Sequence, residues 1–244
     1  MDKNYDYRLP RLFIETDLAE NSTIPLDDDS AHYLKNVLRR PDGSQLRVFN
    51  GRHGEFLAFF TAVDRKKYNL TVESQIRPQP NPTKEIHLVF APIKKDRQDF
   101  MIEKSVELGA THFHPVLTQQ TVIRDLNEKR VAKQIQEASE QSERLALPEL
   151  NPLQKLAEFI RDWPEEISLL AAIERQDTVF LGEITIPNKC AFLIGPEGGF
   201  SESEREMLLS NKKITPVGLG DQILRAETAA LFGLSLIVAH QRPN

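Results

Sequence analysis

Residues 190–201 read CAFLIGPEGGFS, and residues 217–230 read VGLGDQILRAETAA. The two segments share one order: an apolar run ends in glycine, a tight loop follows, and a helix begins. The repetition predicts two parallel strands whose carboxyl ends point the same way. Open α/β sheets bind their ligands at that edge.

The first loop combines three glycines with a single carboxylate. Gly195, Gly198 and Gly199 permit positive φ and close approach of the backbone to a ligand, and Pro196 stiffens the loop. The Lys-Ser/Thr ending of a phosphate loop and the G-x-G-x-x-G fingerprint are both absent. The loop therefore favours a compact ligand such as a nucleoside over a polyphosphate. A tight turn before a capped helix is the alternative interpretation, since Ser201 and Glu204 have the spacing of a capping box.

The second loop carries charge beside an apolar segment. Arg225 and Glu227 follow Ile223-Leu224 and precede an alanine-rich helix predicted over 229–240. Such charges are costly unless they are paired or functional. Two interpretations remain, a structural Arg–Glu ion pair and part of a site.

Composition limits the functional classes. The chain has 244 residues, 40% hydrophobic and 27% charged, as in a globular protein of one large or two modest domains. A net charge of -5 argues mildly against a general nucleic-acid binder. The N-terminus shows no secretory signal and no apolar run is long enough for a membrane span. Cys190 is the one cysteine, so an internal disulfide is excluded and a buried, inert thiol is expected in the cytoplasm.

The chain divides at a proline-rich linker, Pro78–Pro82, which is unsuited to the interior of a helix or sheet. Before it, three predicted strands (46–49, 55–63 and 68–72) follow a short strand at 12–14 and a helix over 27–39. After it, strands at 85–91, 111–117 and 168–173 alternate with helices over 98–108, 127–145 and 153–160. This alternation predicts a parallel sheet covered on both faces. We therefore expect domains at 1–77 and 85–244, joined by residues 78–84.

Basic side chains of the first domain form a candidate RNA-facing surface, because arginine suits phosphate and base-edge contacts. An ordinary hydrated charged face is the alternative. The residues concerned are Arg8, Arg11, His32, Arg39, Arg40, Arg52 and His53.

These motifs together resemble the SPOUT methyltransferases, and more narrowly the bacterial family that methylates N3 of a uridine in 16S ribosomal RNA. The resemblance covers essentially the whole chain. It is carried by the segments Gly195–Gly199, Leu219-Gly220, Ile223–Arg225 and Glu227-Thr228, by His32 with Val37–Arg39 and Gly51, by Glu103-Lys104 with Glu107–Gly109, and by Glu140–Ser142 with Arg144 and Pro148.

The resemblance implies a fold and a set of partners. It implies a parallel sheet with a C-terminal trefoil knot, a PUA-like N-terminal β-barrel that binds RNA, and a homodimer whose interface we place at the long helix 127–145 and the C-terminal helix. It further implies bound S-adenosyl-L-methionine, 16S ribosomal RNA of the small ribosomal subunit as substrate, and neither metal nor membrane.

The resemblance also implies site residues. Arg225 is the first candidate to stabilise the imide anion of the uridine, and Glu197 and Glu227 are second candidates as proton acceptors or orienting groups. The expected cofactor-binding residues are Leu193, Ile194, Gly195, Pro196, Glu197, Gly198, Gly199, Leu219, Gly220, Ile223, Leu224 and Thr228. Lys94, Lys95 and Arg144 join Arg8, Arg11, His32, Arg39 and Arg40 as expected RNA-binding residues.

The chain departs from the family pattern at three positions. Gln222 replaces an arginine near the second loop, Glu143 replaces a glycine, and Val131 stands where a tryptophan is common. Three other functions stay open: a SPOUT enzyme with another RNA target, a non-enzymatic RNA-binding assembly factor, and a small-molecule α/β enzyme.

Overall fold

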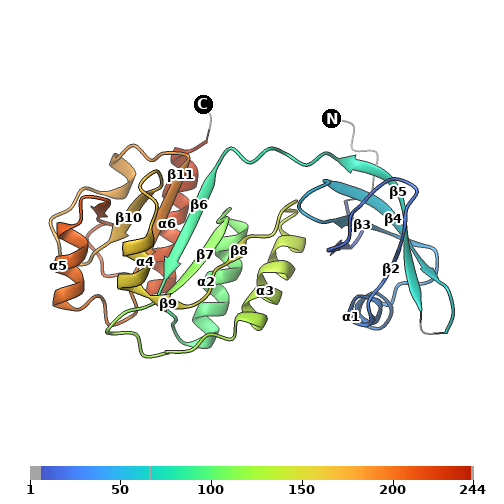
Figure 1. The fold of residues 1–244 in the computed structure, drawn as a ribbon, viewed down its shortest axis with the longest axis horizontal. Coiled ribbons are helices and arrows are strands. Elements are labelled where there is room, and N and C mark those ends of the chain that lie inside the picture. Colours follow the sequence, from blue (N-terminus) through green and yellow to red (C-terminus); the bar gives the residue numbers. More distant parts are fainter. Residues whose placement is uncertain (1–6, 66, 243–244) are drawn as a thin grey trace. The chain divides into compact units, whose positions relative to one another are not determined.

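The computed structural model describes residues 7–65 and 67–242. The N-terminal stretch inspected for a secretory signal begins with residues that lie outside these ranges. The chain divides into two compact units (Figure 1). The N-terminal unit comprises Met1–Asn81 together with Ser139–Leu147, and the C-terminal unit comprises Pro82–Ala138 together with Pro148–Asn244. The segment 139–147 therefore groups with a part of the chain that is distant in sequence.

The N-terminal unit is built on a five-stranded sheet of order β1-β3-β4-β5-β2. Its strands are β1 (Arg11–Phe13), β2 (Thr23–Pro25), β3 (Ser44–Phe49), β4 (Glu55–Ala62) and β5 (Tyr68–Arg77). Strand β1 pairs with β3 in parallel and the remaining pairs are antiparallel. Alternate residues of β3, β4 and β5 enter one core, as the period of two in a strand requires. The short β2 was not predicted from the sequence.

The helix predicted over 27–39 begins where expected but is divided. Asp27 is its N-cap, and its side chain accepts a hydrogen bond from the Ser30 amide at 2.6 Å. Helix α1 (Asp28–His32) is followed by a π-helical turn, η1 (Tyr33–Val37).

The C-terminal unit is built on a parallel sheet of order β12-β10-β11-β6-β7-β8, with β9 also paired to β7. Its strands are β6 (Glu85–Phe90), β7 (His112–Leu117), β8 (Glu149–Leu150), β9 (Gln154–Lys155), β10 (Ser168–Ala172), β11 (Lys189–Ile194) and β12 (Ile214–Val217). Its helices are α2 (Lys95–Glu107), α3 (Glu128–Gln141), α4 (Leu156–Asp162), the short 3-10 helix η2 (Leu181–Glu183), α5 (Glu202–Ser210) and α6 (Ala226–His240). The predicted parallel sheet is confirmed, with β10 lying between β11 and β12.

Both faces of this sheet are covered, because successive side chains of a strand point to opposite faces. On one face Phe90 and Phe192 pack against α2, α3 and α6. On the other face Val89 and Leu193 pack against α4 and α5. Helix α6 lies so close to β11 that a Cβ on Gly233 would stand 2.2 Å from the Phe192 ring, which requires glycine there. Cys190 is buried as expected, and burial raises the pKa of its thiol to about 12.

Some element boundaries differ from those expected. Helix α2 begins at Lys95, three residues earlier than the sequence indicates, and α4 begins after the two-residue β9. Helix α3 ends at Gln141 rather than at 145. Two residues later, Glu143 has φ of +57°, a left-handed conformation that ends helices and usually favours glycine. Among the described residues, no helix has the length and apolarity needed to cross a membrane.

Candidate functional site

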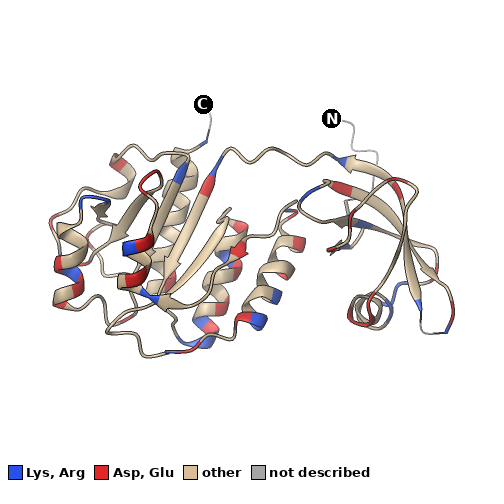
Figure 2. Ribbon diagram, viewed as in Figure 1, with Lys and Arg blue, Asp and Glu red and all other residues tan. Residues whose placement is uncertain are grey.

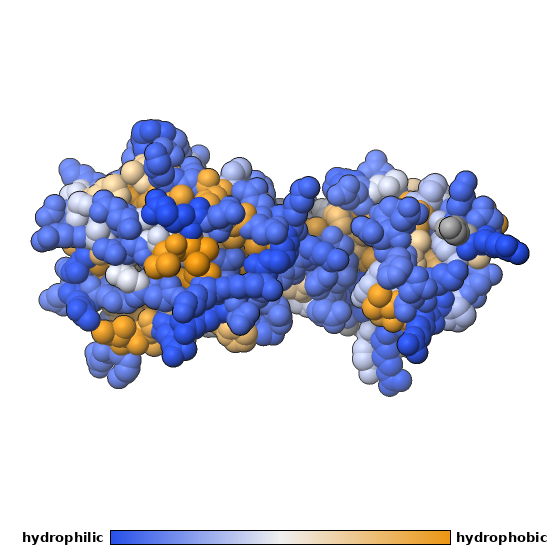
Figure 3. Space-filling model, turned by 90° about the horizontal axis from the view of Figure 1, so that it is seen from below, coloured by the Kyte–Doolittle hydropathy of each residue, from blue (hydrophilic) through white to orange (hydrophobic). Residues whose placement is uncertain are grey.

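The candidate site is a pocket of about 870 Å³ in the C-terminal unit, at the carboxyl ends of β10, β11 and β12. Figure 3 shows the protein from below the view of Figure 1, the side toward which the β6 arrow points. Apolar residues are exposed on the surface of this unit in that view. Both glycine-containing loops line the pocket, which lies at the edge of the sheet where the sequence predicts a site. The lining comprises Ala172–Gln176, Ile194–Phe200, Val217–Ala226, Arg97, Arg205 and Ala229.

The first loop is held in shape by its own hydrogen bonds. The Gly199 amide donates to the Pro196 carbonyl at 2.9 Å, and Gly199 has φ of +69°. The predicted capping box is confirmed: the Ser201 hydroxyl accepts from the Glu204 amide at 3.2 Å, and the Glu204 carboxylate accepts from the Ser201 amide at 2.9 Å. The loop is therefore fixed directly onto the start of α5.

The second loop passes beside the segment that follows β10. The Gly218 amide donates to the Val179 carbonyl at 2.9 Å, and the Leu181 amide donates to the Gly218 carbonyl at 3.0 Å. This crossing lies in the segment where the resemblance implies a trefoil knot; the knot itself stays a prediction. Gly220 has φ of +106°, and Arg225 is the N-cap of α6.

Most of the expected cofactor-binding residues meet in the pocket, and two do not line it. Ile194, residues 195–199, Leu219, Gly220, Ile223 and Leu224 all contribute to the lining. Leu193 is fully buried in β11 behind the pocket, on the face that packs against α4 and α5. Thr228 is exposed on the first turn of α6, outside the lining.

The carboxylates of the site are paired with an arginine that the sequence analysis did not select. Arg97 Nη1 lies 3.6 Å from Glu197 Oε1, and Arg97 Nε lies 3.7 Å from Glu227 Oε1. We call these three residues the Arg97 cluster. It joins α2, the first loop and α6, and the Arg97 side chain is 37% exposed. The one sequence feature that could have identified Arg97 is its position in the charged segment Lys94–Arg97, directly after the first strand of the unit.

Arg225 is not the partner of these carboxylates. Its side chain is exposed and makes no hydrogen bond or ion pair with any residue that the structure describes. It lines the pocket, whereas Glu227 is buried beside it with Oε2 lacking a hydrogen-bond partner. The Arg225–Glu227 ion pair considered from the sequence is thus replaced by an Arg97–Glu227 pair. The Arg225 guanidinium is available to a ligand in the pocket.

The expected RNA-binding residues differ in how far their side chains are exposed. Arg8, His32, Arg39, Lys94 and Lys95 are exposed, and Arg40 is half-buried. In Figure 2 acidic residues stand among the basic ones in both units, so the basic residues do not form a continuous positive surface in this view. Arg144 is half-buried, and burial lowers the pKa of its guanidinium to about 10.

Arg11 requires a correction, because it is 6% exposed and already fully engaged. Its Nε donates to Glu55 at 2.5 Å, and its terminal nitrogens donate to the carbonyls of Ser139, Glu140 and Arg144 at 3.0, 2.8 and 2.8 Å. A buried guanidinium that saturates the carbonyls at the end of α3 is a structural group. It does not belong to an RNA-facing surface.

Arg11 is one member of a buried network in the N-terminal unit. Glu55 is 0% exposed, and Arg47 and Arg77 approach its carboxylate at 3.9 and 3.2 Å. Arg47 also pairs with Glu143 at 3.0 Å. We call Arg11, Arg47, Glu55, Arg77 and Glu143 the Glu55 cluster. It ties the segment 139–147, including Glu143 with its left-handed backbone, to the sheet.

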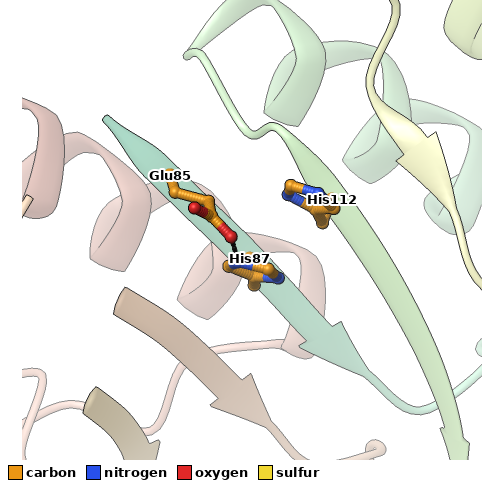
Figure 4. Close-up of side chains that lie close together, drawn as sticks. All are labelled: Glu85, His87 and His112. Atoms are coloured by element: carbon orange, nitrogen blue, oxygen red, sulfur yellow. Dashed lines mark hydrogen bonds and ion pairs between the residues drawn. The ribbon is translucent and has the colours of Figure 1, made fainter. Parts of the chain in front are cut away.

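A third polar cluster lies at the start of β6 and β7, on the sheet face covered by α4. Potential metal-ligand atoms of Glu85, His87 and His112 lie within 4.8 Å of one another (Figure 4). The His87 and His112 rings are nearly parallel, with centroids 4.1 Å apart, so their in-plane lone pairs do not converge on a point. Lys189 already pairs with Glu85 at 2.8 Å. The cluster is therefore a stacked, hydrogen-bonded network in this structure.

Comparisons with known proteins agree with this architecture. A family model described as an RNA methyltransferase domain matches residues 79–238, and one described as an RNA methyltransferase PUA domain matches residues 26–73. Ribosomal RNA small subunit methyltransferase E of Rickettsia conorii is 33% identical over 236 residues, which cover 93% of this chain and 94% of that protein. The protein of the same name from a Synechocystis species is 31% identical, covering 94% and 77%.

A solved structure shows the same fold. The crystal structure of ribosomal RNA small subunit methyltransferase E from Neisseria gonorrhoeae, bound to S-adenosyl methionine, has a TM-score of 0.83 at 28% identity. The match covers 93% of this chain and 95% of that chain. Both parts of the resemblance, the SPOUT-type catalytic fold and the PUA-like domain, are confirmed. The chain belongs to the family of the ribosomal RNA small subunit methyltransferases E.

Proposed function

We propose that this protein transfers a methyl group from S-adenosyl-L-methionine to N3 of a uridine in the 16S ribosomal RNA of the small ribosomal subunit. The observation that carries the proposal is the pocket formed by the two glycine-containing loops, whose lining includes the exposed Arg225, a residue that pairs with none of the described side chains. The names of the relatives, and the cofactor bound to the solved relative, agree with it. We place the protein in the cytoplasm, where its RNA substrate is found.

The pocket suits the cofactor in size and chemistry. Its volume of about 870 Å³ lies within the range of small-molecule sites, and backbone of both loops supplies amides and carbonyls to a nucleoside. Residues 194–199 and 219–224 would hold the cofactor. When bound, it supplies an electrophilic methyl group on a sulfonium.

Arg225 is the residue we assign to the reacting base. N3 of a neutral uridine carries a proton, and its loss leaves an imide anion between two carbonyl oxygens. A guanidinium placed beside these atoms stabilises the anion, and a fixed cation acts without reorganisation during the reaction. Because the Arg225 side chain forms no hydrogen bond with other described residues, all of its N–H groups can donate to the base.

The Arg97 cluster holds the carboxylates that we keep as proton acceptors. Arg97 stands between Glu197, which lines the pocket, and Glu227, which is buried beside it, and reduces the repulsion between the two carboxylates. The unpartnered Oε2 of Glu227 is a buried acceptor, which makes Glu227 the better candidate for a hydrogen bond from a ligand or an intervening water. The cluster thus holds one carboxylate in the pocket lining and one directly behind it.

RNA binding is assigned to residues on both units. We propose that residues 1–77 form the RNA-binding domain, residues 78–84 the linker and residues 85–244 the catalytic domain. Residues 1–6 lie outside the described ranges. Arg8, His32, Arg39, Arg40, Lys94, Lys95 and Arg144 are the proposed contacts. N3 lies on the Watson–Crick edge, so the target base must be unpaired or flipped out of a helix.

We also propose that the protein acts as a homodimer in which α6 takes part in the interface. The sequence of this helix is mostly apolar and its apolar residues are not confined to one side, a property of helices that are buried on most sides. Its inner side packs on the sheet, whereas Phe232 stays exposed, and Phe100 is exposed on the neighbouring α2. A second copy would cover this surface. The end of α3, in contrast, is already occupied by the Glu55 cluster.

The direct test is methyl transfer from labelled S-adenosylmethionine to small-subunit particles that lack the modification, with the product nucleoside identified by mass spectrometry. Appearance of 3-methyluridine is the expected result. A methyl group on ribose or on another base would contradict the assignment to N3. Saturable cofactor binding without transfer would indicate a different RNA target, and absence of both would indicate a non-enzymatic RNA-binding protein.

A further inference from the structure

A second cavity, separate from the cofactor pocket, lies next to the segment that joins β7 to α3. Thr118 and Thr121 anchor this segment, because both are buried and the Thr118 amide donates to the Thr121 hydroxyl at 2.8 Å. Leu126 is buried at its other end. Between these anchors the side chains turn outward: Val122 is 81% exposed, Ile123 is 38% exposed, and Arg124 is exposed.

One buried carboxylate, that of Glu204, links this segment to the end of the first glycine-containing loop (residues 195–199). Glu204 accepts the Gln119 amide on Oε1 at 2.8 Å and the Ser201 amide on Oε2 at 2.9 Å. Close packing adds to this link, since a Cβ on Gly198 would lie 3.3 Å from the Cβ of Gln120. The β7–α3 segment and this loop are therefore both anchored at the start of α5, so a ligand held beside one is positioned relative to the other.

The second cavity has a volume of about 350 Å³ and combines an apolar floor with two cations. Leu117, Leu156 and Met207 supply apolar surface, and Arg124 and Lys155 supply charge. Arg124 makes no hydrogen bond or ion pair within the residues that the structure describes. Lys155 is 3.5 Å from Glu158, an exposed pair that a phosphate can displace. The Glu204 carboxylate also lines the cavity, with its oxygens occupied by the two backbone amides.

We propose that this cavity binds a nucleotide of the RNA substrate that flanks the methylated uridine, with Arg124 and Lys155 at its phosphate and the apolar floor against its base. The inference rests on the proposed function, from which it takes the nature of the substrate. A target base exposed at N3 leaves its neighbours single-stranded, and single-stranded RNA is bound by cations along the backbone and apolar or aromatic surface under the bases. Val122 and Ile123, which precede Arg124 in sequence, are further exposed apolar side chains outside the cavity lining.

The first test compares Arg124→Ala, Arg124→Lys and Arg161→Ala in methyl transfer to unmodified small-subunit particles. Arg161 is the matched control, because it is an exposed arginine on α4 that bonds to Asp162 and does not line the cavity. We expect Arg124→Ala to raise KM for the particles roughly 10-fold, as loss of a charge-assisted phosphate contact does. Arg124→Lys should recover part of this loss, while the cofactor Kd and the Arg161→Ala enzyme stay at wild-type values.

The second test needs no methyl transfer. Binding of a short, fluorescently labelled single-stranded uridine oligonucleotide is followed by anisotropy as salt is raised. Arg124→Ala and Lys155→Ala should each weaken binding and reduce the slope of log affinity against log salt by roughly 0.7 per lost phosphate contact. An unchanged slope and an unchanged KM would overturn the proposal, as would an equal loss of cofactor affinity in Arg124→Ala.

The two tests separate failure of the site from failure of the proposed function. If the wild-type protein transfers no methyl group but its oligonucleotide binding depends on Arg124, the cavity binds RNA and the proposed reaction is wrong. If methyl transfer proceeds and neither KM nor oligonucleotide binding responds to Arg124→Ala, the reaction stands and the cavity has no part in RNA binding.

Discussion

The N-terminal and C-terminal units each contain a cluster in which arginine side chains meet glutamate carboxylates, and the two clusters differ in burial. In the Glu55 cluster the carboxylate at the centre is 0% exposed and three guanidinium groups surround it. In the Arg97 cluster one half-exposed guanidinium lies between two carboxylates at 3.6 and 3.7 Å. Arg225 stands on the same pocket with no partner among the described residues.

The difference separates structural from functional charge. Removing a charge from water is costly, and close pairing with hydrogen bonds must offset that cost. The Glu55 cluster meets this requirement and holds the segment 139–147 in the N-terminal unit. In the Arg97 cluster the ion pairs are longer and the side chains are more exposed. Donor and acceptor atoms there remain able to bind a ligand. Residue type alone does not distinguish the two cases, so the comparison has to be tested by substitution.

The largest effect is expected for Glu55→Ala. The substitution leaves Arg11, Arg47 and Arg77 close together without the carboxylate that neutralises them. Breaking a buried ion pair by removal of one partner typically costs about 3–5 kcal/mol, and we expect a loss of that size in the free energy of unfolding, measured with urea. Asp17→Asn, which removes an exposed partner of Arg52, is the control and should leave the midpoint unchanged. Equal behaviour of the two variants would contradict a structural role for the Glu55 cluster.

Arg225→Ala should have the opposite profile, a large loss of activity with no loss of stability. Removing one preorganised donor to a developing anion lowers kcat by about 10²–10³-fold. Single-turnover kinetics measure the fall in the rate of methyl transfer. Thermal unfolding of the same preparation measures the unfolding temperature, which should not change. Arg225→Lys keeps the charge without the planar fork and should be intermediate. A drop in unfolding temperature as large as that of Glu55→Ala would remove the distinction between the clusters.

The polar cluster of Glu85, His87 and His112 provides a pH test of buried polar groups that carry no assigned function. It is joined by His114, whose Nε2 lies 2.9 Å from His87 Nδ1. Burial, followed by the nearby His112, lowers the pKa of His87 to about 4, and burial followed by His87 lowers the pKa of His114 to about 3. The unfolded chain binds protons near pH 6.5 whereas the folded chain does not, so stability is complete above that pH and falls as the pH drops toward 4.

Each of the two histidines should contribute a loss on the order of 2–3 kcal/mol between pH 6.5 and 4. Glu85, Lys189 and Glu149 face the same cluster and contribute to the total. Urea unfolding at several pH values measures the slope, and His114→Asn should flatten it. A slope that is the same in His114→Asn would show that other groups are responsible.

The smallest effect is expected for Arg97→Ala. Because Arg97 is itself 37% exposed and lies 3.6 and 3.7 Å from Glu197 and Glu227, its loss should lower kcat/KM by about 10-fold, the size of a modest change in positioning. The double variant Arg97→Ala/Glu197→Gln removes the repulsion as well as the cation and should recover part of the activity. If the double variant is less active than Arg97→Ala, relief of carboxylate repulsion is not the role of Arg97.

Local features of this chain followed from the sequence. The two strand-loop-helix segments, the capping box of Ser201 and Glu204, the parallel sheet and the buried Cys190 all depend on patterns within a few neighbouring residues. Hydrophobic periodicity and backbone capping act over one or two turns, so they are legible without knowledge of the fold. The short β2 and the early start of α2 were not predicted, because three-residue strands and helix ends show little hydrophobic periodicity.

Only the tertiary structure decided which charges are buried and with whom they pair. Arg11 meets Glu55 and Ser139 across 44 and 128 residues of sequence, and Arg97 meets two carboxylates from other elements. Every arginine carries the same charge in the sequence, whereas its role depends on the partners and the dielectric that the fold places around it. The sequence alone thus determined the family, the sheet and the loops of the site, and the fold determined that Arg11 is structural and that Arg97 holds the carboxylates.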